Sequence, residues 1–194
     1  MRPKVLVGVP NGGTMKEKMY LTSLSMLMNA DCELVLMGYN GAYPFHGRWN
    51  IGQRALQLAC SHILYLDNDM ALDVTALGKL LAHNVDLVGA AYNYRAHPIR
   101  TTVKMKDAAG KIYIPDSLPN ELFQCAAVGL GCTLVTTAAM RKIPQPWFAC
   151  KWREDGSMQW SDDVWFCHQA ASVGIPTWCD PTLTDTRHIG EYEY

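Results

Sequence analysis

The sequence predicts one α/β domain that covers residues 1–194, with a mixed, mostly parallel central sheet flanked by helices. Short apolar runs alternate with longer helical patterns through the first third of the chain, which is typical of parallel strands joined by crossover helices. A turn signal near residues 107–110 predicts an antiparallel hairpin as well. A chain of 194 residues is long enough to bury a sizeable core in one domain.

The N-terminal segment consists of a predicted strand at residues 4–9, a turn at Pro10-Asn11-Gly12-Gly13, a helix at 15–28 and a strand at 33–37. This order of strand, turn, helix and strand is the opening of a Rossmann-like nucleotide fold. The glycine pair lacks the full G-x-G-x-x-G pattern, and no P-loop lysine follows it. The segment therefore disfavours a dinucleotide-dependent dehydrogenase and a P-loop ATPase.

A loop rich in glycine, tyrosine and proline at residues 38–47 precedes a predicted helix at 50–60. Arg48, Asn50 and Arg54 lie at or near the start of this helix. They form either a solvated surface or the contact for a bound nucleotide diphosphate, because guanidinium groups donate strong hydrogen bonds to phosphate oxygens. The sequence leaves both interpretations open.

The next strand, at residues 63–66, is predicted to be buried on both faces, and two aspartates follow it. Asp67 and Asp69 are two positions apart, so both carboxylates can approach one hard cation. In open α/β sheets, ligands bind just beyond the carboxyl ends of the strands. A polar turn that caps the following helix would also explain the pair. Its position after a buried strand favours a divalent cation that in turn holds phosphates.

The central region continues with a predicted helix at residues 75–83 and a strand at 86–91. His83 is expected at the surface, where the C-terminus of the helix favours a cationic side chain. Residues 92–98 are polar and aromatic, a composition that suits a binding loop.

The predicted hairpin pairs residues 102–105 with 111–114, and a longer strand is predicted at 125–136. Gly129 and Gly131 lie in this strand. Glycine within a strand either bends it or allows the backbone to approach a ligand closely.

The C-terminal third begins with a predicted short helix at residues 138–143, followed by an aromatic loop at 147–160. The loop either packs as a lid on the core or stacks on a sugar. Ser161-Asp162-Asp163 opens a helix that continues to about residue 173. Capping by the serine and the helix dipole would by themselves explain both aspartates. A strand at 177–179 and a polar tail that contains His188 complete the chain.

Composition excludes several classes of protein. The formal net charge is −1, and no run of lysine or arginine occurs, which disfavours an electrostatic nucleic-acid binder. No stretch approaches the length of a membrane span, and the N-terminus does not resemble a signal peptide. The seven cysteines are scattered without C-x-x-C spacing, which favours reduced core residues over a zinc ribbon or a thioredoxin motif. We therefore expect a cytoplasmic protein, in the host cytoplasm if its source is a virus.

Six segments resemble, in order, the motifs of GT-A glycosyltransferases, most closely those of the large family 2 group. They are similar to the first strand with its nucleotide-base turn, the Arg-Asn helix start, the DxD strand, the glycine strand of the substrate pocket, the acidic xED element and the metal-binding histidine segment. The matching residues are 7–11, 48–52, 65–69, 129–135, 161–166 and 187–190.

The chain departs from this pattern in three places. Trp49 interrupts the Arg-Asn pair, and the acidic element is Asp-Asp rather than Glu-Asp. The sequence also ends just past His188, which leaves little room for an acceptor subdomain and suggests a minimal member of viral or truncated origin.

The resemblance implies a GT-A fold and a metal-dependent transfer of a sugar from a UDP- or GDP-sugar donor to a hydroxyl group on a carbohydrate or another acceptor. It implies that Mn²⁺ or Mg²⁺ is held by Asp69 and His188, while Asp67 serves the ribose or a metal-bound water. It also implies that Asp163, with Asp162 as its substitute, is the base of an inverting transfer. The donor-binding residues implied are Pro10, Asn11, Arg48, Asn50, Asp67, Asn68, Gly129 and Gly131.

Two alternatives remain. A nucleotidyltransferase acting on a sugar phosphate also uses paired aspartates and a metal ion, but it usually has a glycine-rich loop with a nearby cation, of which Lys16 and Lys18 offer only a loose version. A nucleotide-sugar-binding module that has lost turnover would keep the same residues. Assays with an NTP and a sugar phosphate distinguish the first, and donor binding without turnover identifies the second.

Overall fold

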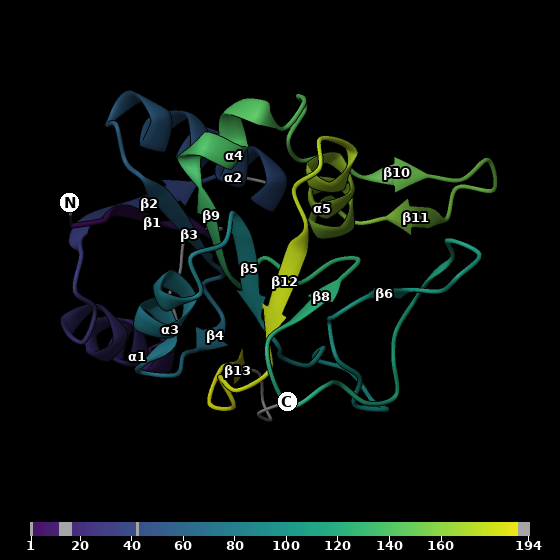
Figure 1. Cartoon of the computed structure of the whole chain (residues 1–194), viewed down its shortest axis with the longest axis horizontal. Helices are drawn as coiled ribbons and strands as arrows, with labels where there is room; N and C mark the ends of the chain where they lie inside the picture. The colour runs from purple at the N-terminus through teal and green to yellow at the C-terminus, as the bar shows by residue number, and fades with distance from the viewer. Residues whose placement is uncertain (1, 12–16, 42, 190–194) are drawn as a thin grey trace.

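The structure is a computed structural model, and it describes residues 2–11, 17–41 and 43–189. A seven-stranded sheet lies between two layers of helices (Figure 1). The helices are α1 (Glu17–Met28), α2 (Pro44–Gln57), α3 (Ala76–Ala82), α4 (Thr137–Lys142) and α5 (Asp162–Ser172). The glycine turn predicted at residues 12–13 lies outside the described residues.

The strands of the main sheet are, in spatial order, β2 (Glu33–Asn40), β1 (Lys4–Asn11), β3 (His62–Leu66), β9 (Cys132–Thr136), β5 (Leu87–Ala90), β12 (Thr177–Asp180) and β8 (Phe123–Cys125). Three two-stranded ladders accompany it. They pair β4 (Met70–Ala71) with β13 (Arg187–His188), β6 (Met105–Lys106) with β7 (Ile112–Tyr113), and β10 (Lys151–Trp152) with β11 (Met158–Trp160).

The prediction of a mixed α/β sheet is confirmed, but its mostly parallel pairing is not. The ladders β1–β2, β1–β3 and β5–β12 are parallel, whereas β3–β9, β5–β9 and β8–β12 are antiparallel. Strand β9 runs against both of its neighbours and separates β3 from β5. The chain reaches β9 only after a long excursion, and alternation of apolar residues does not encode strand direction.

Alternate residues of the central strands face two separate cores, one under each helix layer. Along β3, Ile63 and Tyr65 join the core that includes α2, α4 and α5. Leu64 and Leu66 join the core that includes α1 and α3. This period of two explains why the apolar run at residues 63–66 is continuous, because both faces of β3 are buried.

Close packing of α2 on β1 depends on Gly8. A Cβ at this position would lie 2.2 Å from Cγ2 of Ile51, which is fully buried in α2. The absent side chain therefore lets the helix approach the strand, and this approach sets the position of the residues along α2.

Most predicted elements occur within a few residues of their expected bounds, including the hairpin at β6–β7 and the helix α5. Three predictions are wrong. The aromatic loop expected at 147–160 contains the antiparallel hairpin β10–β11. The loop expected at 38–47 is shorter, because β2 extends to Asn40 and α2 begins at Pro44, whose fixed φ suits the first helical turn. The strand expected at 125–136 is shorter: β9 begins only at Cys132, and residues 126–131 connect it to β8, which lies in a different part of the sheet.

Other predictions concern single side chains. Five of the seven cysteines are buried, and all seven are free thiols. His83 is more enclosed than expected, since its Nε2 lies 2.8 Å from Oδ2 of the buried Asp180. None of the helices in the described part of the chain has the length and apolar character needed to cross a membrane.

Candidate functional site

The site forms where β3 ends. Asp67, Asn68 and Asp69 make the turn between β3 and β4, and the Asp67 amide donates a hydrogen bond to the Gly131 carbonyl at 3.1 Å. Pairing of β4 with β13 brings the C-terminal segment to the same turn, with His188 opposite Met70. The backbone therefore places a late histidine beside the aspartate pair.

Arg48, from the second turn of α2, links the β3–β4 turn to α5. Its guanidinium donates to Oδ1 of Asp67 and to Oδ2 of Asp162, each at 2.5 Å. The Arg48 side chain is only 7% exposed. Burial alone would lower its pKa, but the two carboxylates outweigh burial and raise the pKa above its ordinary value. Its third donor, Nε, is buried without a partner among the described residues.

Asp163 differs from Asp162 in its environment. Its Oδ1 accepts hydrogen bonds from the Ser161 hydroxyl and, at 2.8 Å, from the Val164 amide at the start of α5. No cation lies within ion-pair distance of it in the described residues. Burial raises the pKa of Asp163 above its ordinary value, although the Ser161 hydrogen bond opposes this. Asp163 is therefore better suited than Asp162 to accept a proton.

The orientation of His188 is fixed by the loop that follows β5. Its Nδ1 lies 2.6 Å from the Asn93 carbonyl, and its ring meets Tyr92 edge to face at 4.9 Å between centroids. Because a carbonyl only accepts hydrogen bonds, Nδ1 is the donor in this contact, and Nε2 is the ring nitrogen left for another ligand. Metal-binding histidines are commonly oriented in this way.

The oxygen and nitrogen atoms around the β3–β4 turn are of the kinds that bind a hard divalent cation. Each carboxylate has one engaged oxygen: Asp67 Oδ1 on Arg48, and Asp69 Oδ2 on Arg95 at 2.9 Å. The other oxygen of each has no partner in the described residues, and one imidazole nitrogen is available. However, no group of three histidine, cysteine or acidic side chains is already close enough to hold a metal ion in the part of the chain that is described. A cation would therefore have to draw these ligands together and compete with Arg95.

These side chains share one cavity of about 530 Å³. Nine residues singled out from the sequence line it, and they come from β1, α2, the β3–β4 turn, the segment before β9, α5 and β13: Pro10, Arg48, Asp67, Asn68, Asp69, Gly129, Asp162, Asp163 and His188. The expected convergence of distant carboxylates with a late histidine is thus present in the structure.

Two residues expected to contact a donor lie outside the cavity wall. Asn50 does not line the cavity, because its amide donates to the His46 carbonyl one turn earlier in α2. Gly131 is not in the cavity wall either. A Cβ there would lie 2.7 Å from the Tyr92 hydroxyl, so this glycine makes room for a tyrosine rather than a ligand. Of Asn11, only the backbone is described.

Several residues that line the cavity are not predicted individually by the sequence, which indicates only a binding loop at 92–98. Tyr92, Tyr94 and Arg95 come from this loop, and Phe45 comes from the first turn of α2. Cys150 also lines the cavity, but burial raises the pKa of its thiol, which disfavours the thiolate form. The cavity therefore offers carboxylates for proton transfer rather than an activated sulfur nucleophile.

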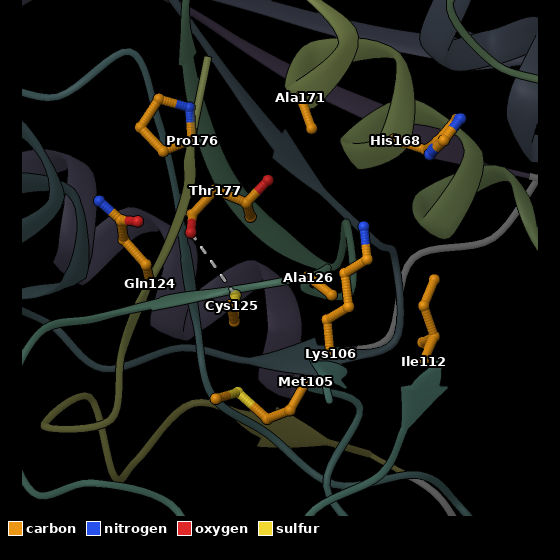
Figure 2. Close-up of a pocket in the computed structure, with 10 residues that line it drawn as sticks. All are labelled: Met105, Lys106, Ile112, Gln124, Cys125, Ala126, His168, Ala171, Pro176 and Thr177. Carbon is orange, nitrogen blue, oxygen red and sulfur yellow. Dashed lines mark hydrogen bonds between the residues drawn. The ribbon is translucent and has the colours of Figure 1, made fainter. Parts of the chain in front are cut away.

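A separate cavity of about 320 Å³ lies among β6, β8, α5 and β12 (Figure 2). Cys125 points toward Thr177 there, and its thiol donates to the Thr177 carbonyl at 3.8 Å. Burial raises the pKa of this thiol well above its ordinary value. Among the described residues, no aspartate or glutamate lines this cavity, so it offers no carboxylate for metal binding or for acid–base chemistry.

The chain matches no protein-family model, and no curated protein matches it either. Among solved structures it is similar to the crystal structure of A197 from STIV, with a TM-score of 0.63 and 20% sequence identity. The similarity covers 98% of this chain and 86% of A197. At this level of identity the likeness shows that the two chains share a fold.

Proposed function

We propose that this chain is a metal-dependent glycosyltransferase that moves a sugar from a nucleotide-diphosphate donor to a hydroxyl acceptor. The observation that carries the proposal is the single cavity lined by Asp67, Asp69, Asp162, Asp163 and His188. These residues come from three distant parts of the chain. They combine ligands for a hard cation with a separate carboxylate of raised pKa.

Sugar transfer requires stabilisation of the negative charge that develops on the leaving diphosphate. Arg48 and Arg95 both line the cavity, and Arg95 is 48% exposed and pairs with one of the described carboxylates, that of Asp69. It is therefore available to donate to phosphate oxygens. Asp69 and His188 would hold Mn²⁺ or Mg²⁺, with Asp67 serving the ribose or a metal-bound water. Such a cation, when bound, supplies charge neutralisation for the diphosphate.

The acceptor hydroxyl must also lose its proton. Asp163 supplies the base, since its raised pKa favours proton uptake and no cation neutralises it at ion-pair distance in the described residues. Asp162 is neutralised by Arg48 and holds that arginine in place. A base on the face opposite the leaving diphosphate would give inversion at the anomeric carbon.

The test is a screen of UDP- and GDP-sugars with and without Mn²⁺, read as thermal stabilisation and as release of the nucleoside diphosphate. A specific donor raises the unfolding temperature because it binds only the folded state. We expect Asp69→Asn to abolish the metal-dependent part of this shift. We expect Asp163→Asn to keep donor binding but to lower transfer by about 10²–10⁴-fold.

Two outcomes would replace the proposal. Reaction of an NTP with a sugar phosphate, but not of an NDP-sugar, would identify a nucleotidyltransferase. Donor binding without hydrolysis or transfer to any acceptor would identify a binding module. Full transfer activity in Asp163→Asn at saturating donor would refute the assignment of the base alone.

A further inference from the structure

We propose that the acceptor is a saccharide bearing an anionic group, and that it binds in a second cavity that adjoins the first. This inference rests on the proposed glycosyl transfer for its role, although binding can be measured without it. The second cavity has a volume of about 600 Å³ and lies between the β6–β7 and β10–β11 hairpins. Both hairpins extend from the same side of the molecule in Figure 1.

The two cavities adjoin at Tyr94 and Ser161, which line both of them. Ser161 donates a hydrogen bond to Asp163, the proposed base. Val164, in the first turn of α5, lines the second cavity as well. A ligand that fills this cavity therefore ends beside the carboxylate that would take its proton.

The charge of the second cavity is opposite to that of the first. Lys104, Lys111 and Arg153 line it, and none of the described aspartates or glutamates does. Within the described residues, none of the three cations forms an ion pair with a carboxylate. The chain as a whole has a formal net charge of −1, so a group of three cations without an acidic residue is a local feature. It would attract an anionic ligand.

Lys104 points most directly to such a ligand. It is half-buried, and its ammonium donates to the Tyr94 hydroxyl, a neutral acceptor. An ammonium group in this environment is normally paired with a carboxylate or phosphate. Burial lowers the pKa of Lys104, although the negative charge of nearby Asp163 opposes this shift, so the charge of Lys104 is only partly compensated. Arg153 is held by the Ser157 hydroxyl and the Met158 carbonyl, again neutral groups.

The remaining walls suit a sugar. Tyr94, Tyr113 and Trp160 contribute aromatic surface, and Tyr113 is 44% exposed. Aromatic rings pack against the apolar faces of sugars, while Gln159 and the cations provide hydrogen-bond donors. A saccharide with a carboxylate or a phosphate matches both features of the cavity.

The test measures binding of two matched pairs of probes by calorimetry, in buffer without divalent cations. Trigalacturonic acid is compared with its neutral methyl ester, and maltose 1-phosphate with maltose. We expect at least one charged probe to bind about tenfold or more tightly than its neutral partner, and its affinity to fall as NaCl is raised from 50 to 300 mM. The pair that shows the difference identifies the anionic group.

Variants locate the binding. Lys104→Met should lower the affinity for the charged probe about tenfold, since it removes a charge-assisted hydrogen bond. Lys106→Met is the matched control, because Lys106 is two residues away but lines the separate cavity of Figure 2. It should leave the affinity unchanged. Unfolding temperatures of both variants show that they are folded.

Equal binding of charged and neutral probes, or an equal effect of the two lysine variants, would overturn the inference. Donor binding is measured separately on the unmodified chain. If nucleotide sugars bind and anionic saccharides do not, this inference fails and the proposed function stands. If anionic saccharides bind at Lys104 and no nucleotide sugar binds, the proposed function fails and this site remains.

Discussion

Removal of the Arg48 guanidinium should destabilise the fold strongly, because this one group joins α2, the β3–β4 turn and α5. We consider Arg48→Met, which keeps most of the aliphatic volume. The two hydrogen bonds at 2.5 Å link a buried cation to carboxylates that are 25% and 18% exposed. Each charged hydrogen bond contributes roughly 1.5–3 kcal/mol. Loss of one partner of a buried ion pair costs about 3–5 kcal/mol.

Partial exposure of Asp67 and Asp162 lets water solvate them once the arginine is gone, so we take the lower end of this range. The expected loss is about 3 kcal/mol in the free energy of unfolding. For a chain of this size, that loss corresponds to a fall of roughly 6–12 °C in the unfolding temperature. Urea denaturation at pH 7, with the slope held equal for both proteins, gives the free energy directly.

The matched control is Arg54→Met, in the same helix. Arg54 is exposed, and within the part of the chain that the structure describes its side chain donates to that of Gln57 alone, at 3.3 Å, so its loss should change stability by less than about 0.5 kcal/mol. A second variant tests the electrostatic cause. Adding Asp67→Asn and Asp162→Asn to Arg48→Met should recover at least half of the loss, because the uncompensated charges disappear. Equal effects of the two arginine variants, or no recovery in the triple variant, would refute the reasoning.

Three further predictions concern stability. Asp163→Asn should stabilise the protein at pH 7. The pKa of Asp163 is raised in the folded state, so the folded state binds more protons and the protein loses stability as pH rises above the ordinary carboxyl pKa. Urea titrations of both proteins at pH 4 and pH 7 would show this difference. Gly8→Ala should lower the free energy of unfolding by about 1–3 kcal/mol, because the new methyl group would collide with Ile51. Gly78→Ala in α3 should raise it by about 0.5–1 kcal/mol in the same assay, because nothing lies within 4 Å of the new methyl group. Asp180→Asn should lower the free energy of unfolding by roughly 1–3 kcal/mol at pH 7, because it weakens the contact of the buried Asp180 carboxylate with His83. Because the folded pKa of Asp180 is lowered, this cost should shrink as pH falls through that pKa, measured by thermal unfolding between pH 7 and pH 3.

The sequence predicted the strand that ends at the site, because burial on both faces leaves a continuous apolar run. It also predicted the polar residues that follow this strand. The positions of Asp67 and Asp69 could be predicted from the local sequence alone, because they depend on where β3 ends. Asp162 and Asp163 could be placed at a helix start, but their approach to β3 depends on Arg48, which bridges 114 residues to reach Asp162.

What could not be predicted depends on pairing between distant segments. Insertion of β9 between β3 and β5 follows no local pattern, and neither does the short β4–β13 ladder that brings His188 to the aspartates. Gly131 shows the same limit. Its residue type suggested contact with a ligand, whereas its neighbour is the Tyr92 ring from another segment. Local pattern identifies a position that needs no side chain, but only tertiary packing decides what occupies the space.

The two arginines of the first cavity differ in a way that bears on its use. Arg48 is enclosed and holds two carboxylates, so it organises the site before any ligand arrives. Arg95 is half-exposed, lies on the loop after β5 and, among the described carboxylates, pairs with Asp69 alone. A cation that takes Asp69 would release Arg95 beside its neighbour Tyr94, which lines both cavities. If the two cavities hold the donor and acceptor proposed above, the loop would contact both, and an exchange of partners at Asp69 would connect them.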